Sequence, residues 1–454
     1  MMSSKPAFLR QLSKKSVATA LALTALTQTG YAQKPSISGI SSGGFMSVQM
    51  ATIFSSRFSG VGTVAGGFFY CAQNHLQDKI EEGQKNILMG SRNLLSFEAT
   101  SQFYAAGANL FIDTSEKEKW FAPKKENPIY QAVGVCMANP AQATLPDLNK
   151  MAAAGKIDST DTFKNLKAYI YQGSSDTVVN KDMISQLTSF YINNGIADSQ
   201  IKTTLGTGGH NFPTDKEGLN DCKEQDIPYI SSCGMDIAKE ILEHTTGKSL
   251  VKSTAQREHL YMVDQTLDLK NKAHSEDKWI QPSMSLAPYG YLYAPEQCLS
   301  NPASCTVHVA LHGCKMSDSF SQEFDEKYQK QVAQTTVLAM RTNADRNFFN
   351  FFYPTIEEKI NQYGTLKFAV NSGYIDYAEK NNLMILFPQT WITEKNYPYN
   401  PKGCWDWFGW TGHNYANKNG AEAKWMMKFI DQITKNPKEA ILSTRPHFEA
   451  LEQK

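Results

Sequence analysis

Short apolar runs bounded by glycine and polar residues recur along the chain and predict buried β-strands. Isoleucine alternates with serine at residues 36–40, and glycines bound an apolar run at residues 60–67. A continuous apolar run such as the second is typical of a strand that is buried on both faces of a parallel sheet, and the alternation in the first is typical of a short strand. The remaining runs of this kind cover residues 167–172, 201–205, 289–293, 306–311 and 383–387.

Helical patterns alternate with these runs. Residues 45–51 follow the first strand as a helix expected to be buried on one face, and residues 421–434 have the apolar spacing of a further helix. Strands that alternate with helices indicate an α/β fold with a mostly parallel sheet and helices on both faces.

Composition places the chain among ordinary globular proteins. It has 454 residues, of which 41% are hydrophobic and 20% charged, and its net charge is +1. This near-neutral balance gives no indication of nucleic-acid binding. We find no internal repeat and no low-complexity linker, so we expect residues 33–454 to form a single domain. We also expect the protein to be a monomer.

The first 32 residues differ in kind from the rest. An apolar run at residues 17–26 follows four basic residues and precedes the small residues Gly30 and Ala32. This pattern predicts a signal peptide cleaved after Ala32, and a secreted or periplasmic protein that is free of the membrane after cleavage. A membrane anchor is the alternative, but the run falls short of the roughly 20 residues that span a bilayer.

The predicted export bears on the state of the eight cysteines. An even number in an oxidising compartment favours disulfides, and the absence of any C-x-x-C pair argues against a zinc site. We therefore expect no metal and no cofactor. Sequence does not choose among the 105 possible pairings. Proximity and context favour Cys71 with Cys136, Cys222 with Cys233, Cys298 with Cys305, and Cys314 with Cys404.

Gly39, Ser41 and Gly43 fit the pattern G-x-S-x-G. In this pattern a strand turns sharply into a helix and presents the serine hydroxyl at the turn. Ser41 is therefore the candidate nucleophile. A plain serine- and glycine-rich turn is the alternative reading.

An acid and a base follow in the chain. Asp176 comes directly after the strand at 167–172, where an open α/β sheet gathers functional groups, although a turn aspartate is an equal alternative. His210 follows a glycine-rich loop, whereas a lone histidine is more often structural. The order serine, aspartate, histidine is that of the α/β-hydrolases.

The position of Ser41 presents a difficulty, because such hydrolases normally have several strands before the nucleophile. Only eight residues separate Ala32 from Ser41. We infer a circular permutation in which the second half of the chain supplies the missing strands and the polar stretch 245–257 joins the two halves. The C-terminal helix should then lie near the start of the strand at residue 36. Residues 322–367 form a long insertion, either a lid or an ordinary packed segment.

Several separated motifs resemble the poly(3-hydroxybutyrate) depolymerase family, in particular its single-domain, circularly permuted members. They are residues 39–44 (GISSGG), 65–72 (AGGFFYCA), 173–176 (GSSD), 209–213 (GHNFP), 311–314 (LHGC) and 403–407 (GCWDW). The match runs from about residue 35 to about residue 410, but the stretch between Cys71 and Cys136 and the 322–367 region look longer than in compact members.

The resemblance implies an exported serine esterase. Ser41, Asp176 and His210 are its triad, and the amides of Ser42 and Cys314 form its oxyanion hole. Its substrate is a polyester or oligoester, attacked through an acyl-enzyme. Aromatic rings suit an apolar groove, so we expect Trp407 first, and also Trp405 and Trp410, to bind substrate; core packing is the alternative.

Two other functions remain open at this point. One is a carboxylesterase that acts on small or plant-wall esters with the same residues. The other is a binding protein on a hydrolase scaffold that has lost catalysis; it would be favoured if Ser41 and His210 lay beyond hydrogen-bond reach.

Overall fold

The structure is a computed structural model that describes residues 33–72, 130–266, 284–287, 289–318, 364–391, 400, 402–412 and 414–443. The predicted signal peptide and residues 322–363 of the predicted insertion lie outside these described residues, and residues 364–367 begin a helix. Among the described helices, none combines the length and apolar character that crossing a membrane requires.

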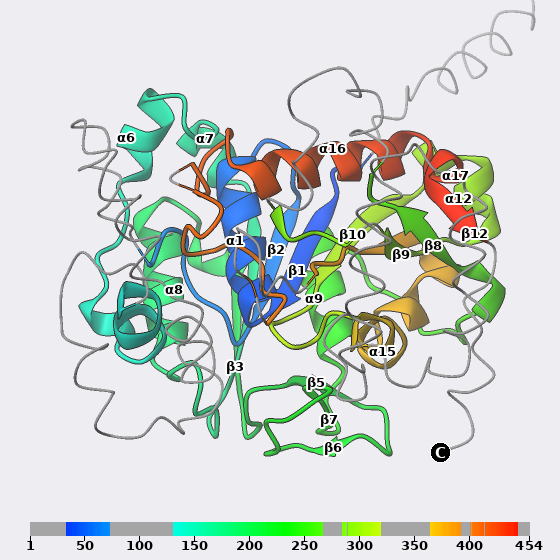
Figure 1. The fold of residues 1–454 in the computed structure, drawn as a ribbon, viewed down its shortest axis with the longest axis horizontal. Coiled ribbons are helices and arrows are strands. Elements are labelled where there is room, and N and C mark those ends of the chain that lie inside the picture. Colours follow the sequence, from blue (N-terminus) through cyan, green and yellow to red (C-terminus); the bar gives the residue numbers. More distant parts are fainter. Residues whose placement is uncertain are drawn as a thin grey trace, which may run out of the picture.

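A nine-stranded sheet forms the centre of the described fold, in the order β12-β8-β9-β11-β10-β1-β2-β3-β4 (Figure 1). Its six strands from β11 to β4 run parallel, whereas β9, β8 and β12 pair antiparallel at one edge. The strands are β1 (Ser36–Ile40), β2 (Gly60–Val64), β3 (Lys167–Gly173), β4 (Ile201–Gly206), β8 (Leu260–Asp264), β9 (Tyr289–Tyr293), β10 (Thr306–Leu311), β11 (Leu383–Phe387) and β12 (Ile441–Ser443). The predicted mostly parallel α/β fold is confirmed.

Helices cover both faces of this sheet. The helices are α1 (Ser42–Ile53), α6 (Leu148–Ala153), α7 (Thr160–Phe163), α8 (Met183–Asn193), α9 (Ile237–Thr246), α12 (Glu296–Ser300), α15 (Gly364–Asn371), α16 (Ala421–Lys435) and α17 (Pro437–Ala440). Shorter turns are the π-helical η1 (Tyr130–Met137) and the 3₁₀ segments η2 (Pro140–Gln142), η3 (Asp198–Gln200), η4 (Arg257–His259), η5 (Pro302–Ser304), η7 (Tyr374–Tyr377) and η8 (Glu379–Asn381).

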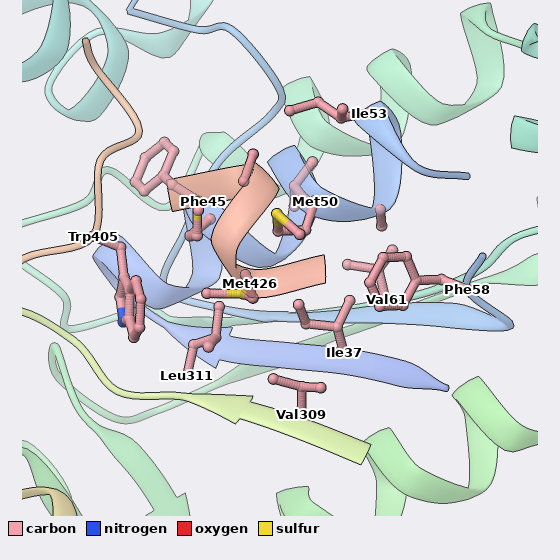
Figure 2. Close-up of a cluster of buried hydrophobic side chains, with 14 of the residues drawn as sticks. Ile37, Phe45, Met50, Ile53, Phe58, Val61, Val309, Leu311, Trp405 and Met426 are labelled. Atoms are coloured by element: carbon pink, nitrogen blue, oxygen red, sulfur yellow. The ribbon is translucent and has the colours of Figure 1, made fainter. Parts of the chain in front are cut away.

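Two apolar cores lie on opposite faces of the sheet. One joins the sheet to α1, α8 and α16, and the other joins it to α9 and α15. In the first core, Ile37, Val309 and Leu311 of the strands face Phe45 and Met50 of α1 and Met426 of α16 (Figure 2). Burial of such side chains is the main favourable contribution to folding.

Helix α1 is buried on every side, not on one face as the sequence predicts. All residues from Ser42 to Ile53 are buried. The buried amide of Gln49 donates to the carbonyl oxygens of Asp406 and Tyr415, at 2.9 and 3.1 Å. The chain around residues 406–415 therefore covers the side of α1 that faces away from the sheet.

The two halves of the chain meet at β1. Strand β2 pairs with one edge of β1, and β10 from the second half pairs with the other. Helix α16 packs against β10, and its Met426 belongs to the same buried cluster as Ile37 of β1 (Figure 2). This arrangement is the one expected of the circular permutation.

Four disulfides are present, in the same pairs that proximity and context favour. They join Cys71 to Cys136, Cys222 to Cys233, Cys298 to Cys305, and Cys314 to Cys404. Cys222–Cys233 lies in the segment that contains a small three-stranded sheet of β5 (Phe212–Thr214), β7 (Ile230–Ser232) and β6 (Asn220–Asp221).

Candidate active site

Close backbone approaches explain the glycines of the turn between β1 and α1. A Cβ atom at Gly39 would lie 2.3 Å from the carbonyl oxygen of Gly43, and one at Gly43 would lie 2.4 Å from that of His312. Real Cβ atoms do not approach backbone this closely. The two glycines therefore let β1, α1 and the chain after β10 meet around Ser41.

Ser41 has a backbone conformation that is rare for a residue with a side chain. Its φ is 55° and its ψ −123°. The turn is held by its N–H, which donates to Val64 (2.9 Å), and by its carbonyl oxygen, which accepts from Phe45 N–H (2.9 Å). Such strain at the tip of a strand–turn–helix unit is the mark of a nucleophile elbow.

The structure brings Ser41, Asp176 and His210 together. The Ser41 hydroxyl donates to Nε2 of His210 at 2.9 Å, and Nδ1 of His210 donates to Oδ2 of Asp176 at 2.9 Å. Their side chains come from three loops, each of which follows a parallel strand: β1, β3 and β4. Because parallel strands end at one edge of the sheet, residues 135 and 34 positions apart meet here.

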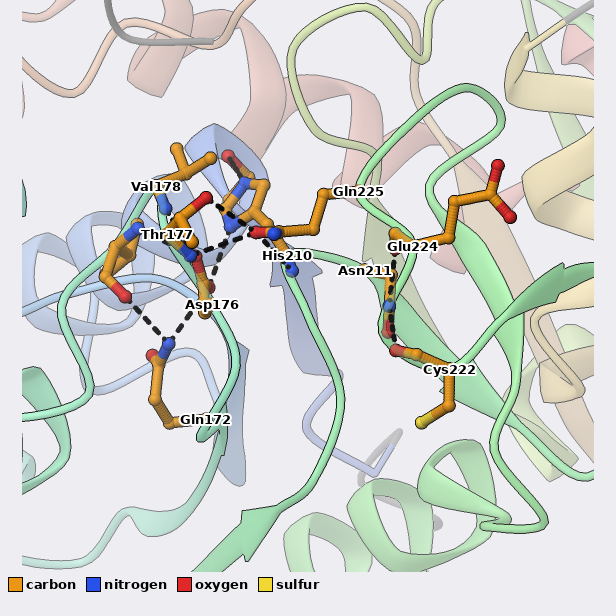
Figure 3. A network of polar contacts seen from close by, with 11 residues as sticks. Gln172, Asp176, Thr177, Val178, His210, Asn211, Cys222, Glu224 and Gln225 are labelled. Atoms are coloured by element: carbon orange, nitrogen blue, oxygen red, sulfur yellow. Dashed lines mark hydrogen bonds and ion pairs between the residues drawn. The ribbon is translucent and has the colours of Figure 1, made fainter. Parts of the chain in front are cut away.

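The side chain of Asp176 is fully buried and well supplied with hydrogen-bond donors. Its Oδ1 accepts from the backbone N–H of Val178 and Val179, at 2.8 and 2.9 Å, and its Oδ2 accepts from Gln172 at 2.9 Å (Figure 3). These bonds satisfy the carboxylate in the absence of bulk water and fix its orientation toward His210.

Gln225 joins the loop of the acid to the loop of the base. Its Oε1 accepts from the backbone N–H groups of Thr177 and His210, at 2.9 and 3.0 Å (Figure 3). Asn211, beside His210, donates to the carbonyl oxygens of Cys222 and Glu224 and so holds this segment in place. The sequence analysis identifies neither Gln172 nor Gln225 as a site residue. Gln172 could have been found from its position at the end of the strand before Asp176, whereas no sequence pattern marks Gln225.

The backbone N–H of Ser42 is available at the site. Ser42 is the first residue of α1, so its N–H has no acceptor within the helix, and the residue lines the same pocket as Ser41. Cys314 lines this pocket from the loop after β10. A Cβ atom at the adjacent Gly313 would lie 3.1 Å from Cβ of Ser41, so this loop passes directly over Ser41.

His312 holds the loop that carries Cys314. Nδ1 of His312 donates to the carbonyl oxygen of Gly313 at 2.7 Å, and its Nε2 accepts from the N–H of Thr390 at 3.2 Å. Complete burial lowers the pKa of His312 to about 4, so the ring is neutral at pH 7. The Gly313 carbonyl belongs to the same peptide group as the Cys314 N–H, and this bond therefore fixes the direction of that N–H.

An apolar pocket, partly open to solvent, lies in front of Ser41 and His210. Trp407 lines it and stacks on Phe45, with ring centroids 3.9 Å apart. In the described part of the chain, neither Trp405 nor Trp410 lines this pocket. Trp405 is fully buried and donates to the carbonyl oxygen of His312 (3.1 Å), and Trp410 is half-buried against the core, so for these two the core-packing alternative fits better.

The described residues contain no group of three or more His, Cys, Asp or Glu side chains placed to hold a metal ion. The chemistry available at this site is that of a serine, a histidine and a carboxylate in a hydrogen-bonded chain, with backbone N–H groups beside them.

The mostly parallel sheet and the three converging side chains have the arrangement found in serine hydrolases of the α/β-hydrolase class. The chain is similar to poly(3-hydroxybutyrate) depolymerases, which confirms the resemblance carried by its motifs. It is 26% identical over 404 residues to the poly(3-hydroxybutyrate) depolymerase of Delftia acidovorans and 27% identical over 409 residues to the polyhydroxybutyrate depolymerase of Talaromyces funiculosus. These matches cover 88% of this chain, and they span 59% of the Delftia protein and 88% of the Talaromyces protein.

Solved structures agree in fold. A PHB depolymerase complexed with an R3HB trimer superposes with a TM-score of 0.55 at 22% identity, and PHB depolymerase from Penicillium funiculosum with a TM-score of 0.54 at 23% identity. Each comparison covers 91% of this chain and 97% of the other. No protein-family model matches the chain.

Proposed function

We propose that this protein is an exported serine esterase that hydrolyses poly(3-hydroxybutyrate) or its oligomers through an acyl-enzyme intermediate. The observation that carries the proposal is the hydrogen-bonded chain from Ser41 Oγ through His210 to Asp176, which opens on an apolar pocket. The distance of 2.9 Å between Ser41 and His210 weighs against a scaffold that has lost catalysis.

The first half of the reaction forms the acyl-enzyme. Ser41 Oγ attacks the ester carbonyl carbon while its proton passes to Nε2 of His210. Asp176 stabilises the resulting imidazolium. The oxyanion accepts hydrogen bonds from the N–H groups of Ser42 and Cys314. His210 then gives the proton to the departing alkoxide, and the alcohol leaves.

The second half uses water in the same way. His210 takes a proton from the water, whose oxygen attacks the acyl carbon. The Ser41–acyl bond breaks and Ser41 recovers its proton from His210. Each cycle consumes one ester bond and one water and releases one carboxylic acid and one alcohol.

The substrate class rests on the pocket and on the relatives. Its walls include Phe45, Val178 and Trp407, which suit the methyl-bearing backbone of a polyester. Relatives along 88% of the chain are named for depolymerisation of this polyester. Four disulfides support an oxidising destination outside the cytoplasm, as the predicted signal peptide does.

Turbidity clearing of a poly(3-hydroxybutyrate) suspension tests the proposal, run beside a short soluble ester and with Ser41→Ala as the control. Clearing that disappears in Ser41→Ala supports a polymer-cleaving serine hydrolase. Hydrolysis of the soluble ester alone assigns the protein to the carboxylesterases. Loss of neither activity in Ser41→Ala contradicts the assignment of the nucleophile.

A further inference from the structure

The pocket in front of Ser41 has an uneven distribution of charge. Its walls are mostly apolar, yet Lys315 and Lys402 both line it. No aspartate or glutamate is among the described residues that line it. A neutral polyester segment has no group that requires a lysine such as Lys315 in the lining of this pocket.

Lys315 is held in place by the chain around it. It directly follows Cys314, and its φ of 64° lies in the left-handed region that a side chain seldom adopts. Its N–H donates to the carbonyl oxygen of Lys402 at 2.7 Å, and the Cys314–Cys404 disulfide joins the same two segments. The backbone of Lys315 is thereby fixed at one side of the pocket, and outlying backbone conformations of this kind cluster at functional sites.

The side chain of Lys315 is half-buried. Burial lowers its pKa, an effect that Asp226 opposes. No described carboxylate forms an ion pair with its ammonium group. A partly desolvated cation in an apolar pocket favours an anionic ligand group, because a charge-assisted hydrogen bond restores what the ammonium loses on leaving water.

We propose that Lys315 forms a subsite for the free carboxylate of the leaving hydroxy acid. The proposal rests on the esterase function above. An oligoester of a hydroxy acid ends in a carboxylate on the alcohol side of its last ester bond. When that bond lies at Ser41, the carboxylate belongs to the group that departs as the alcohol. The enzyme therefore prefers acid-terminated oligoesters over the same esters with a neutral end.

A comparison of kcat/KM for two substrates that differ only in their end group tests this subsite. The trimer of 3-hydroxybutyrate is offered as the free acid and as its methyl ester, and kcat/KM for total ester-bond cleavage within the chain is measured for each with the full-length protein. Wild type prefers the acid. In Lys315→Gln we expect kcat/KM for the acid to fall about 5- to 10-fold, between the effects of exposed and buried charged pairs, with little change for the methyl ester.

Two further variants make the result specific. Lys424→Gln removes the same charge from an exposed position on α16 and should leave both substrates unaffected. Lys315→Arg should retain the preference for the acid, which shows that the effect of Lys315→Gln is due to charge and not to misfolding. Raising the ionic strength to about 0.5 M should weaken the preference in wild type, since partly exposed charges are screened.

An equal preference in wild type and Lys315→Gln overturns the subsite. A wild-type protein that cleaves neither trimer contradicts the proposed function instead. In that case calorimetric binding of the free-acid trimer decides on the subsite alone: weaker binding by Lys315→Gln supports it, and unchanged or absent binding overturns it.

Discussion

The N–H of Thr390 donates to Nε2 of His312 across 3.2 Å, so the single proton of this neutral imidazole lies on Nδ1, where it bonds to the carbonyl oxygen of Gly313. The two bonds connect the loop after β11 to the peptide group that ends in the Cys314 N–H. The direction of that N–H thus depends on a histidine that does not line the pocket.

His312→Phe keeps a ring of similar shape but removes the donor to Gly313. We expect kcat to fall about tenfold with little change in KM, less than the 10²–10³ typical of losing an oxyanion donor itself, because the N–H remains but is less well directed. His312→Asn retains a donor near the Nδ1 position and should lose less activity. Steady-state kinetics on a soluble ester, with thermal unfolding to check the fold, measure both. Equal losses in the two variants would contradict the role of the Nδ1 donor.

Gln225→Ala removes the acceptor shared by Thr177 and His210. The loops of acid and base then lose their direct connection, and we expect kcat to fall between about 5- and 50-fold, since small displacements of positioned groups are costly. The exposed Gln142→Ala on η2 is the matched control and should leave kcat unchanged. Full activity in Gln225→Ala would show that Asp176 and His210 are held adequately by their other contacts.

Removal of the Cys314–Cys404 disulfide should affect catalysis more than removal of Cys298–Cys305. Both pairs flank β10, but Cys298–Cys305 precedes its first residue, away from Ser41. The double variant Cys314→Ala/Cys404→Ala keeps the amide at position 314 and loosens its loop. We expect kcat to fall more than about tenfold in this variant, toward the 10²–10³ typical of losing an oxyanion donor, and to stay near wild type in Cys298→Ala/Cys305→Ala. Similar kcat values in the two variants would count against this role of the loop.

His308 should make the fold sensitive to acid. Its ring nitrogens pair with the hydroxyls of Ser36 and Ser38 at 2.7 and 2.8 Å, and complete burial lowers its pKa to about 3. An unfolded histidine takes up a proton below about pH 6.5, which the folded one resists. The stabilising contribution is therefore complete above pH 6.5 and is lost as pH falls toward 3, at no more than about 1.4 kcal/mol per pH unit.

Urea unfolding at several pH values between 4 and 7 measures this dependence. His308→Gln should be less stable than wild type at pH 7, because it leaves one serine hydroxyl unpaired. The difference between the two proteins should shrink as the pH falls. Parallel curves for wild type and variant would refute a role for His308 in the acid sensitivity.

Sequence pattern located the parallel strands because their apolar runs are continuous. Residues 306–311, 383–387 and 289–293 coincide with β10, β11 and β9, and the remaining predicted strands agree within a few residues. Strand β8 (Leu260–Asp264) was not predicted, since its short run directly follows the polar stretch interpreted as the joint between the two halves.

Features that depend on contacts between distant parts of the chain could not be predicted from the sequence. The outer side of α1 is covered by residues more than 350 positions later, so its local pattern does not predict complete burial. The three residues proposed as the triad each follow a strand, which made them detectable. Gln225 reaches them only because its segment is fastened by Asn211 and includes Cys222 of the Cys222–Cys233 disulfide, and no local pattern reports that.

The two neighbours of β1 are made at different times. A ribosome completes β2, Asp176 and His210 well before it reaches β10, which pairs with β1 from residues about 270 positions away. Until then β1 remains an open sheet edge, and Ser41 lacks the loop that carries Cys314. The site around Ser41 is therefore complete only once the second half of the chain has emerged and closed the sheet.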